Sequence, residues 1–98
     1  MVPSLASPIA LVAGATQVVK AAGPSQYQGI VVRETAGTGC VLRIWDNGSA
    51  ASGTLIDIVA VGANAVVSNV LPVQVWVSNG IFIERVSGTT YEGSIFTG

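Results

Sequence analysis

Charged side chains are scarce in this sequence, and the scarcity limits how the chain can exist in solution. Of its 98 residues only 9% are Asp, Glu, Lys or Arg, and the formal net charge at pH 7 is −1. An ordinary soluble domain carries about 25% charged residues. A net charge near zero with so few charges does not keep a free protein well dispersed. We therefore expect other subunits to cover much of the surface, in a homo-oligomer.

Histidine is absent altogether, which removes the commonest general base and a leading metal ligand. The Ser and Thr residues consequently have no evident base that would activate them as nucleophiles. The sequence also has no cluster of Lys or Arg, which argues against a nucleic-acid partner and against electrostatic binding to a membrane. We expect a protein that is not an enzyme, with no catalytic residue, no cofactor and no metal site.

Cysteine occurs once, at Cys40, so an internal disulfide is excluded. A reactive thiol needs a nearby cation or the N-terminus of a helix, and the sequence points to neither. Cys40 is therefore predicted to be a small buried hydrophobic residue in a strand.

A polar loop, DNGSAASG, lies within the segment 41–55 and is the strongest candidate for a ligand site in the sequence. Calcium takes about six to eight oxygen ligands, usually from several carboxylates, whereas this loop offers Asp46, Asn47 and Ser49. No glycine-rich phosphate loop is present either. We expect a turn between two strands, started by Asp46 and Asn47, whose side chains cap its backbone.

The sequence also lacks any long stretch in which apolar residues recur with the spacing of a helix. Apolar and polar residues alternate instead, in segments separated by Gly, Pro and Asn. This pattern predicts an all-β, two-sheet antiparallel β-sandwich of about eight strands. A jelly roll fits the strand count best, and a Greek-key sandwich of another order stays open. Asn79 and Gly80 predict a type I′ hairpin over 77–82. The expected strands span 15–22, 27–35, 40–46, 53–61, 64–69, 72–78, 80–87 and 90–97.

The first 22 residues contain a short apolar run, IALVAGA, that must be weighed as a targeting signal. No Lys or Arg precedes the run, Pro3 and Pro8 interrupt the segment just before it, and it is too short to span a bilayer. We interpret 1–22 as an extended N-terminal arm with the first strand, and 23–98 as the β-sandwich of a single domain. An arm of this kind can add a strand to a neighbour.

Alternation along the strands separates two kinds of hydrophobic residue. The aliphatic residues of a strand are expected on one side, as Leu42 and Ile44 are in 40–46. In 53–61 the same alternation predicts Ile56 and Ile58 on one side and Asp57 on the other. The large aromatics fall on the side of the charges and amides. Aromatic residues are enriched at interface cores, although some of these side chains fit equally well over sheet edges or under the arm. The predicted interface residues are Trp45, Trp76, Phe82 and Phe96, with Arg43 beside Trp45.

The few charges are expected to form surface ion pairs. Glu84 and Glu92 fall on consecutive predicted strands, so we expect them to lie near each other. Arg33 and Arg85 are expected to pair with carboxylates across strands, at about 0.2–1 kcal/mol each.

The runs GIVVRET, CVLRIWDNGSAASGTLIDIVAV and NGIFIERVSGTTYEGSIF carry a resemblance over 27–97. In this order, a VRE strand, a VLRI-D strand with a small-residue loop, and an NG hairpin resemble the small all-β virion proteins of tailed bacteriophages, of the head decoration (cement) type. In such hairpins an apolar residue often stands where this chain has Arg85.

The resemblance implies a capsid-surface protein of the virion, made in the host cytoplasm, that binds the major capsid protein and braces neighbouring capsomers. It also implies a small homo-oligomer, often a trimer. Two alternatives stay open. One is a carbohydrate- or receptor-binding module, in which Trp45 and Trp76 would lie side by side and stack on sugar rings. The other is a tail or connector component with the same fold.

Overall fold

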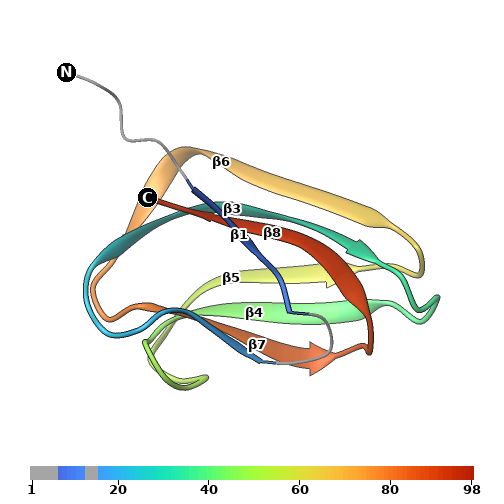
Figure 1. Ribbon diagram of the computed structural model, residues 1–98, viewed down its shortest axis with the longest axis horizontal. Coiled ribbons are helices and arrows are strands. Elements are labelled where there is room, and N and C mark those ends of the chain that lie inside the picture. The colour runs from blue at the N-terminus through green and yellow to red at the C-terminus, as the bar shows by residue number, and fades with distance from the viewer. Residues whose placement is uncertain (1–6, 13–15) are drawn as a thin grey trace.

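The computed structural model describes residues 7–12 and 16–98, and all of its regular structure is β-strand (Figure 1). No helix in this part of the chain is long and apolar enough to cross a membrane. The strands are β1 (Ser7–Ala10), β2 (Gln17–Lys20), β3 (Ser25–Glu34), β4 (Cys40–Asp46), β5 (Thr54–Val61), β6 (Val66–Val77), β7 (Ile81–Ser87) and β8 (Tyr91–Thr97).

The strands form two four-stranded sheets that pack face to face. The first sheet has the order β1-β8-β3-β6 and the second the order β2-β7-β4-β5, with every neighbouring pair antiparallel. The chain crosses repeatedly between the sheets, and this order of eight strands is that of a jelly roll. Figure 1 shows β6, β3 and β8 above β5, β4 and β7. The predicted all-β sandwich of jelly-roll type is confirmed.

The segment 1–22 supplies one edge strand to each sheet. β1 pairs with β8 in the first sheet and β2 pairs with β7 in the second. The alternation pattern did not single out β1, because four residues are too few to show a period. The remaining residues of the segment, 1–6 and 13–15, lie outside the described part of the chain.

β6 is a single strand where the sequence predicts two, over 64–69 and 72–78. Tyr27 of β3 faces Val75 and Gly29 faces Val70, so residues 71–74 of β6 oppose Gln28 alone. This wide bulge contains Pro72, which has no N–H to donate to a ladder. The predicted break is thus a bulge within one strand. The described part of the chain still has eight strands, because β1 was not predicted and the two predicted strands 64–69 and 72–78 form the single strand β6.

The predicted hairpin over 77–82 is wrong. β6 and β7 belong to different sheets, so the residues between them connect the sheets. A type I′ turn needs positive φ at both central residues, whereas Gly80 has φ +114° and, of the described non-glycine residues, only Asn64 has a positive φ.

The core lies between the sheets and is built from one side of each strand. Leu42 and Ile44 on β4, and Ile81 and Ile83 on β7, are buried as the alternation predicts. Cys40 is 2% exposed, which confirms the prediction that it is a buried residue. The core residues are Tyr27, Ile30, Val32, Cys40, Leu42, Ile44, Val59, Val61, Val77, Ile81, Ile83, Tyr91 and Ile95.

β5 departs from simple alternation because it contains a β-bulge. Ile44 faces Asp57 and Trp45 faces Leu55, so Ile56 is an extra residue in β5. A bulge leaves two successive residues on the same side of the strand. Ile56 packs against the core and Ile58 is 54% exposed, so the expectation that these two share a side, opposite Asp57, is wrong.

Beyond this bulge, Asp57 links the two sheets through hydrogen bonds. The buried Tyr27 hydroxyl on β3 donates to Asp57 Oδ2 at 2.8 Å, and Asn69 Nδ2 on β6 donates to the same oxygen at 2.8 Å. Asp57 Oδ1 accepts from the Ile58 N–H at 2.8 Å. Burial, and then the bond to Asp57, raise the pKa of Tyr27. Because a buried hydroxyl must find a partner, Asp57 fixes how β5 sits on the first sheet.

Replacing Asp57 by Ala should destabilise the fold, because the Tyr27 hydroxyl then stays buried without an acceptor. We expect the free energy of unfolding, measured by urea denaturation, to fall by about 1–3 kcal/mol. The matched control, Glu92→Ala at an exposed site on β8, should change it by less than about 0.5 kcal/mol. Equal stability of the two variants would contradict the role given to Asp57.

Candidate functional site

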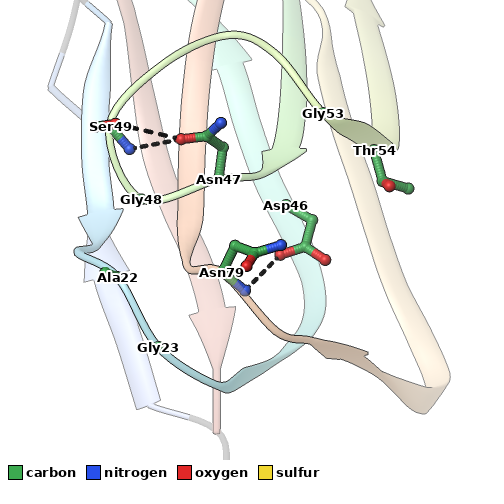
Figure 2. Close-up of a pocket in the computed structure, with 9 residues that line it drawn as sticks. All are labelled: Ala22, Gly23, Asp46, Asn47, Gly48, Ser49, Gly53, Thr54 and Asn79. Atoms are coloured by element: carbon green, nitrogen blue, oxygen red, sulfur yellow. Dashed lines mark hydrogen bonds between the residues drawn. The ribbon is translucent and has the colours of Figure 1, made fainter.

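The polar loop between β4 and β5 lies at one end of the sandwich, beside two other loops (Figure 2). These are the β2–β3 loop, with Ala22 and Gly23, and the β6–β7 loop, with Asn79. The three loops line a shallow hollow. They approach so closely that a Cβ on Gly48 would lie 2.9 Å from the Asn79 carbonyl oxygen. Small residues in the loop therefore serve the close packing of the loops.

The polar groups of this hollow hold the loops themselves. Asn47 Oδ1 accepts hydrogen bonds from the N–H groups of Ser49 and Ala50, at 2.9 and 3.1 Å, as the predicted cap requires. Asp46 acts differently from the prediction, because its carboxylate accepts from the N–H groups of Ser78 and Asn79 at 3.3 and 2.8 Å. Asp46 thus secures the β6–β7 loop rather than its own turn (Figure 2).

A buried carboxylate, Glu34, organises loops at the other end of β3 and β4. It is 0% exposed and accepts hydrogen bonds from the N–H groups of Ala36 and Gly37, both at 2.8 Å, and of Asn64 at 2.9 Å. These bonds, that from Asn64 first, lower the pKa of Glu34 from 4.5 to about 2. Glu34 therefore joins the β3–β4 loop to the β5–β6 loop as an anion at neutral pH.

Burial keeps the Cys40 thiol in its protonated form. Burial, and then the negative charge of Glu34, raise the pKa of the Cys40 thiol, which disfavours the reactive thiolate. In the described residues no group of three or more His, Cys, Asp or Glu side chains gathers as a metal site would require.

The outer surface of the second sheet carries the most extensive candidate site, which we call the Trp45 face. One row crosses all four strands: Val18 pairs with Phe82, Phe82 with Trp45, and Trp45 with Leu55. In the next row Arg43 lies between Glu84 and Ile58. A third row contains Val41 and Ala60. The Trp45 face thus consists of Val18, Val41, Arg43, Trp45, Leu55, Ile58, Ala60, Phe82 and Glu84.

Most of this face is apolar and open to solvent. Val18 is 49% exposed, Leu55 38% and Ile58 54%, whereas Phe82 is only 9% exposed because Val18 and Trp45 flank it. Phe82 is therefore largely covered by its neighbours in the same sheet. Contiguous apolar surface of this kind marks interaction sites on soluble proteins.

The polar groups of the Trp45 face form one small cluster. Trp45 Nε1 donates a hydrogen bond to Glu84 Oε1 at 3.2 Å, and Arg43 Nη1 lies 3.8 Å from the same oxygen. The bond fixes the orientation of the indole ring, so that its apolar part contributes to the surface between Phe82 and Leu55.

The remaining two predicted interface aromatics belong to the first sheet. Phe96 on β8 is half-buried between Pro8 and Gly29 of the neighbouring strands. Trp76 on β6 is 63% exposed and pairs with Gln26. The structure therefore brings Trp45, Phe82 and Arg43 together and places Trp76 and Phe96 elsewhere.

The expectation that Glu84 and Glu92 are neighbours is wrong, because consecutive strands β7 and β8 lie in different sheets. Glu84 pairs with Arg43, and Glu92 lies opposite Arg33. Arg85 donates to the Gly88 carbonyl oxygen at 3.0 Å.

Sequence reasoning missed six members of the Trp45 face, which are Val18, Val41, Leu55, Ile58, Ala60 and Glu84. Three of them lie on β5, where the bulge at Ile56 changes which side chains point outward. Recognising the others required the order of the strands, which places β2 and β4 on either side of β7.

Comparison of the chain with protein-family models, with curated proteins and with solved structures finds no match. The surface and the site must therefore be interpreted from their own geometry.

Protonation of Glu34 should destabilise the protein in acid. A carboxyl group whose pKa falls from 4.5 to about 2 on folding contributes stability that is complete above pH 4.5 and lost towards pH 2. The thermal midpoint of Glu34→Gln should be lower than that of the native chain at neutral pH, and the difference should shrink as the pH falls through this window. Circular dichroism melting curves measure both.

The matched control is Glu92→Gln, at an exposed glutamate on β8. Its melting curves should follow those of the native chain across the same pH range. A difference between native and Glu34→Gln protein that stays constant from neutral pH to acid would disprove the linkage.

Proposed function

We propose that this protein is a non-enzymatic structural component of a virion, which binds the capsid surface and stabilises contacts between capsomers. In this proposal the protein forms a homo-oligomer, for which the resemblance implies a trimer, and its other partner is the major capsid protein. The Trp45 face is the observation that carries the proposal, because its exposed apolar side chains need a protein partner in a chain with so few charges.

A second apolar surface supports a bridging role. β6 forms the edge of the first sheet, and near its bulge Val70 is 54% exposed, Val73 75% and Trp76 63%. Trp76 points away from the core side of the first sheet, since its neighbour Val77 is buried, whereas Trp45 lies on the outer side of the second sheet. A protein that braces an assembly needs contacts on more than one side, and the two surfaces provide them.

The jelly-roll architecture agrees with this role but also occurs in proteins of other functions. Jelly rolls occur in viral capsid proteins, lectins and cupins, and a fold alone does not decide function. The choice rests on the surface chemistry, in which apolar side chains surround a single small polar cluster.

A carbohydrate-binding module is the second candidate, favoured by the 63% exposure of Trp76 and by Gln26 opposite it. Its expected form, with two tryptophans side by side, does not fit the arrangement of the strands. Trp45 and Trp76 lie on the outer sides of different sheets, so they do not share one stacking platform.

Introducing a charge into the Trp45 face should disrupt self-association. Ile58→Lys places an ammonium group in an apolar surface that a partner would have to bury. Sedimentation velocity should show an oligomer for the native chain and a folded monomer for this variant. The control Ser68→Lys, at an exposed position on β6 in the first sheet, should sediment like the native chain.

Electron microscopy of particles that contain the chain tests the rest of the proposal. The protein should lie on the outer surface of the head, between capsomers. A position in the tail or connector would contradict the decoration role and favour a tail or connector component with the same fold.

A further inference from the structure

We propose that the Trp45 face binds the same face of a second copy of the chain about a two-fold axis, with Arg43 of each copy against Glu84 of the other. The inference rests on the proposed function, in which this face is buried in an assembly, and it names the partner and the contact.

The charges of the face are complementary to their own reversed copy. Among the residues that make up the Trp45 face only Arg43 and Glu84 are charged, and they lie side by side in the middle row. A two-fold axis that lies in the plane of the contact, midway between Arg43 and Glu84 and perpendicular to the line joining them, exchanges their positions, so that each positive group meets a negative group. Interfaces between identical subunits related by a two-fold axis use one self-complementary patch.

The pair is not saturated within one chain. Arg43 Nη1 lies 3.8 Å from Glu84 Oε1, which is long for an ion pair, and the same oxygen already accepts the Trp45 N–H. The Arg43 side chain is 43% exposed, so the N–H groups at its outer end are open to a partner. A guanidinium group carries five N–H donors in a planar arrangement that suits a carboxylate. A second carboxylate facing Arg43 would satisfy donors that Glu84 of the same chain leaves free.

The surrounding surface requires a partner with charges of both signs. Val18, Leu55 and Ile58 border the cluster and exclude water once they are covered. A purely apolar partner would then bury Arg43 and Glu84 with no more than their weak mutual contact and the Trp45 N–H bond to Glu84, which is unfavourable. A second copy supplies both charges at the matching spacing, and adds the Trp45 ring as the aromatic centre of the contact.

This contact is isologous, so the smallest assembly that it forms is a dimer. The trimer implied by the resemblance would need a different, head-to-tail contact. The mass of the assembly therefore separates the two.

Charge reversal provides the test. Arg43→Glu leaves two acidic groups on the face and Glu84→Arg leaves two basic groups, so each variant should repel its own copies. We expect the dissociation constant of each, measured by sedimentation equilibrium, to rise at least about tenfold. An equimolar mixture should form a heterodimer about as tight as the native dimer, and the double variant carrying both changes should self-associate like the native chain.

Matched controls come from the other outer face, where Arg33 of β3 lies opposite Glu92 of β8. Arg33→Glu and Glu92→Arg should leave the association unchanged. Circular dichroism checks that every variant folds, and the double variant, which keeps one charge of each sign, tests the geometry even if a single variant does not fold.

The outcomes are distinct. A native trimer, or an oligomer that the reversals at positions 43 and 84 do not weaken, would overturn the two-fold contact and leave the proposed structural role standing. A mixture that fails to restore association would also overturn it. A native chain that stays monomeric in concentrated solution and is absent from the head surface would overturn the contact and the proposed function together.

Discussion

The bulge at Ile56 in β5 determines both how the two sheets are joined and which apolar side chains lie on the outer surface. One extra residue changes which β5 side chains face inward. Asp57 thereby reaches Tyr27 and Asn69 of the other sheet, and Leu55 and Ile58 stand beside Trp45 and Arg43 on the outside. The same local irregularity thus joins the two sheets and creates the apolar surface. Bulges often occur near functional sites because they redirect side chains in this way.

The few acidic residues are used mainly inside the fold. Of the five acidic side chains in the chain, Asp57 links the sheets, whereas Asp46 and Glu34 each hold backbone N–H groups of a second loop, at opposite ends of the sandwich. A carboxylate that accepts backbone hydrogen bonds fixes loops effectively, but it contributes little to keeping the surface solvated. The scarcity of charge outside is therefore greater than the composition suggests, which strengthens the inference that the protein functions in an assembly.

Much of the fold could be predicted, because alternation reports directly which side of a strand is buried. β4, with Leu42 and Ile44 inside and Arg43 and Trp45 outside, follows this rule along its whole length. The predictions that were wrong share one cause. An inserted residue, or a strand that passes to the other sheet, leaves no trace in the alternation of apolar and polar residues. The bulges at Ile56 and around Pro72 were invisible for this reason, and the Asn79–Gly80 connection resembled a hairpin because its residues suit a tight turn. One third of the candidate face was predicted, since Trp45, Phe82 and Arg43 were identified, whereas their neighbours on the face depended on the order of the strands and on the bulge in β5.

If the protein associates through the Trp45 face, the side chains of this face lose their access to solvent as the concentration rises. Hydroxyl-radical footprinting of the purified chain over a range of concentrations measures this loss, because each exposed side chain reports its own access to solvent. Leu55 and Ile58, which are 38% and 54% exposed in the single chain, should become protected as the chain associates, whereas Val73, at 75%, should stay reactive. Oxidation of Ile58 that remains as rapid as that of Val73 at every concentration would contradict the account.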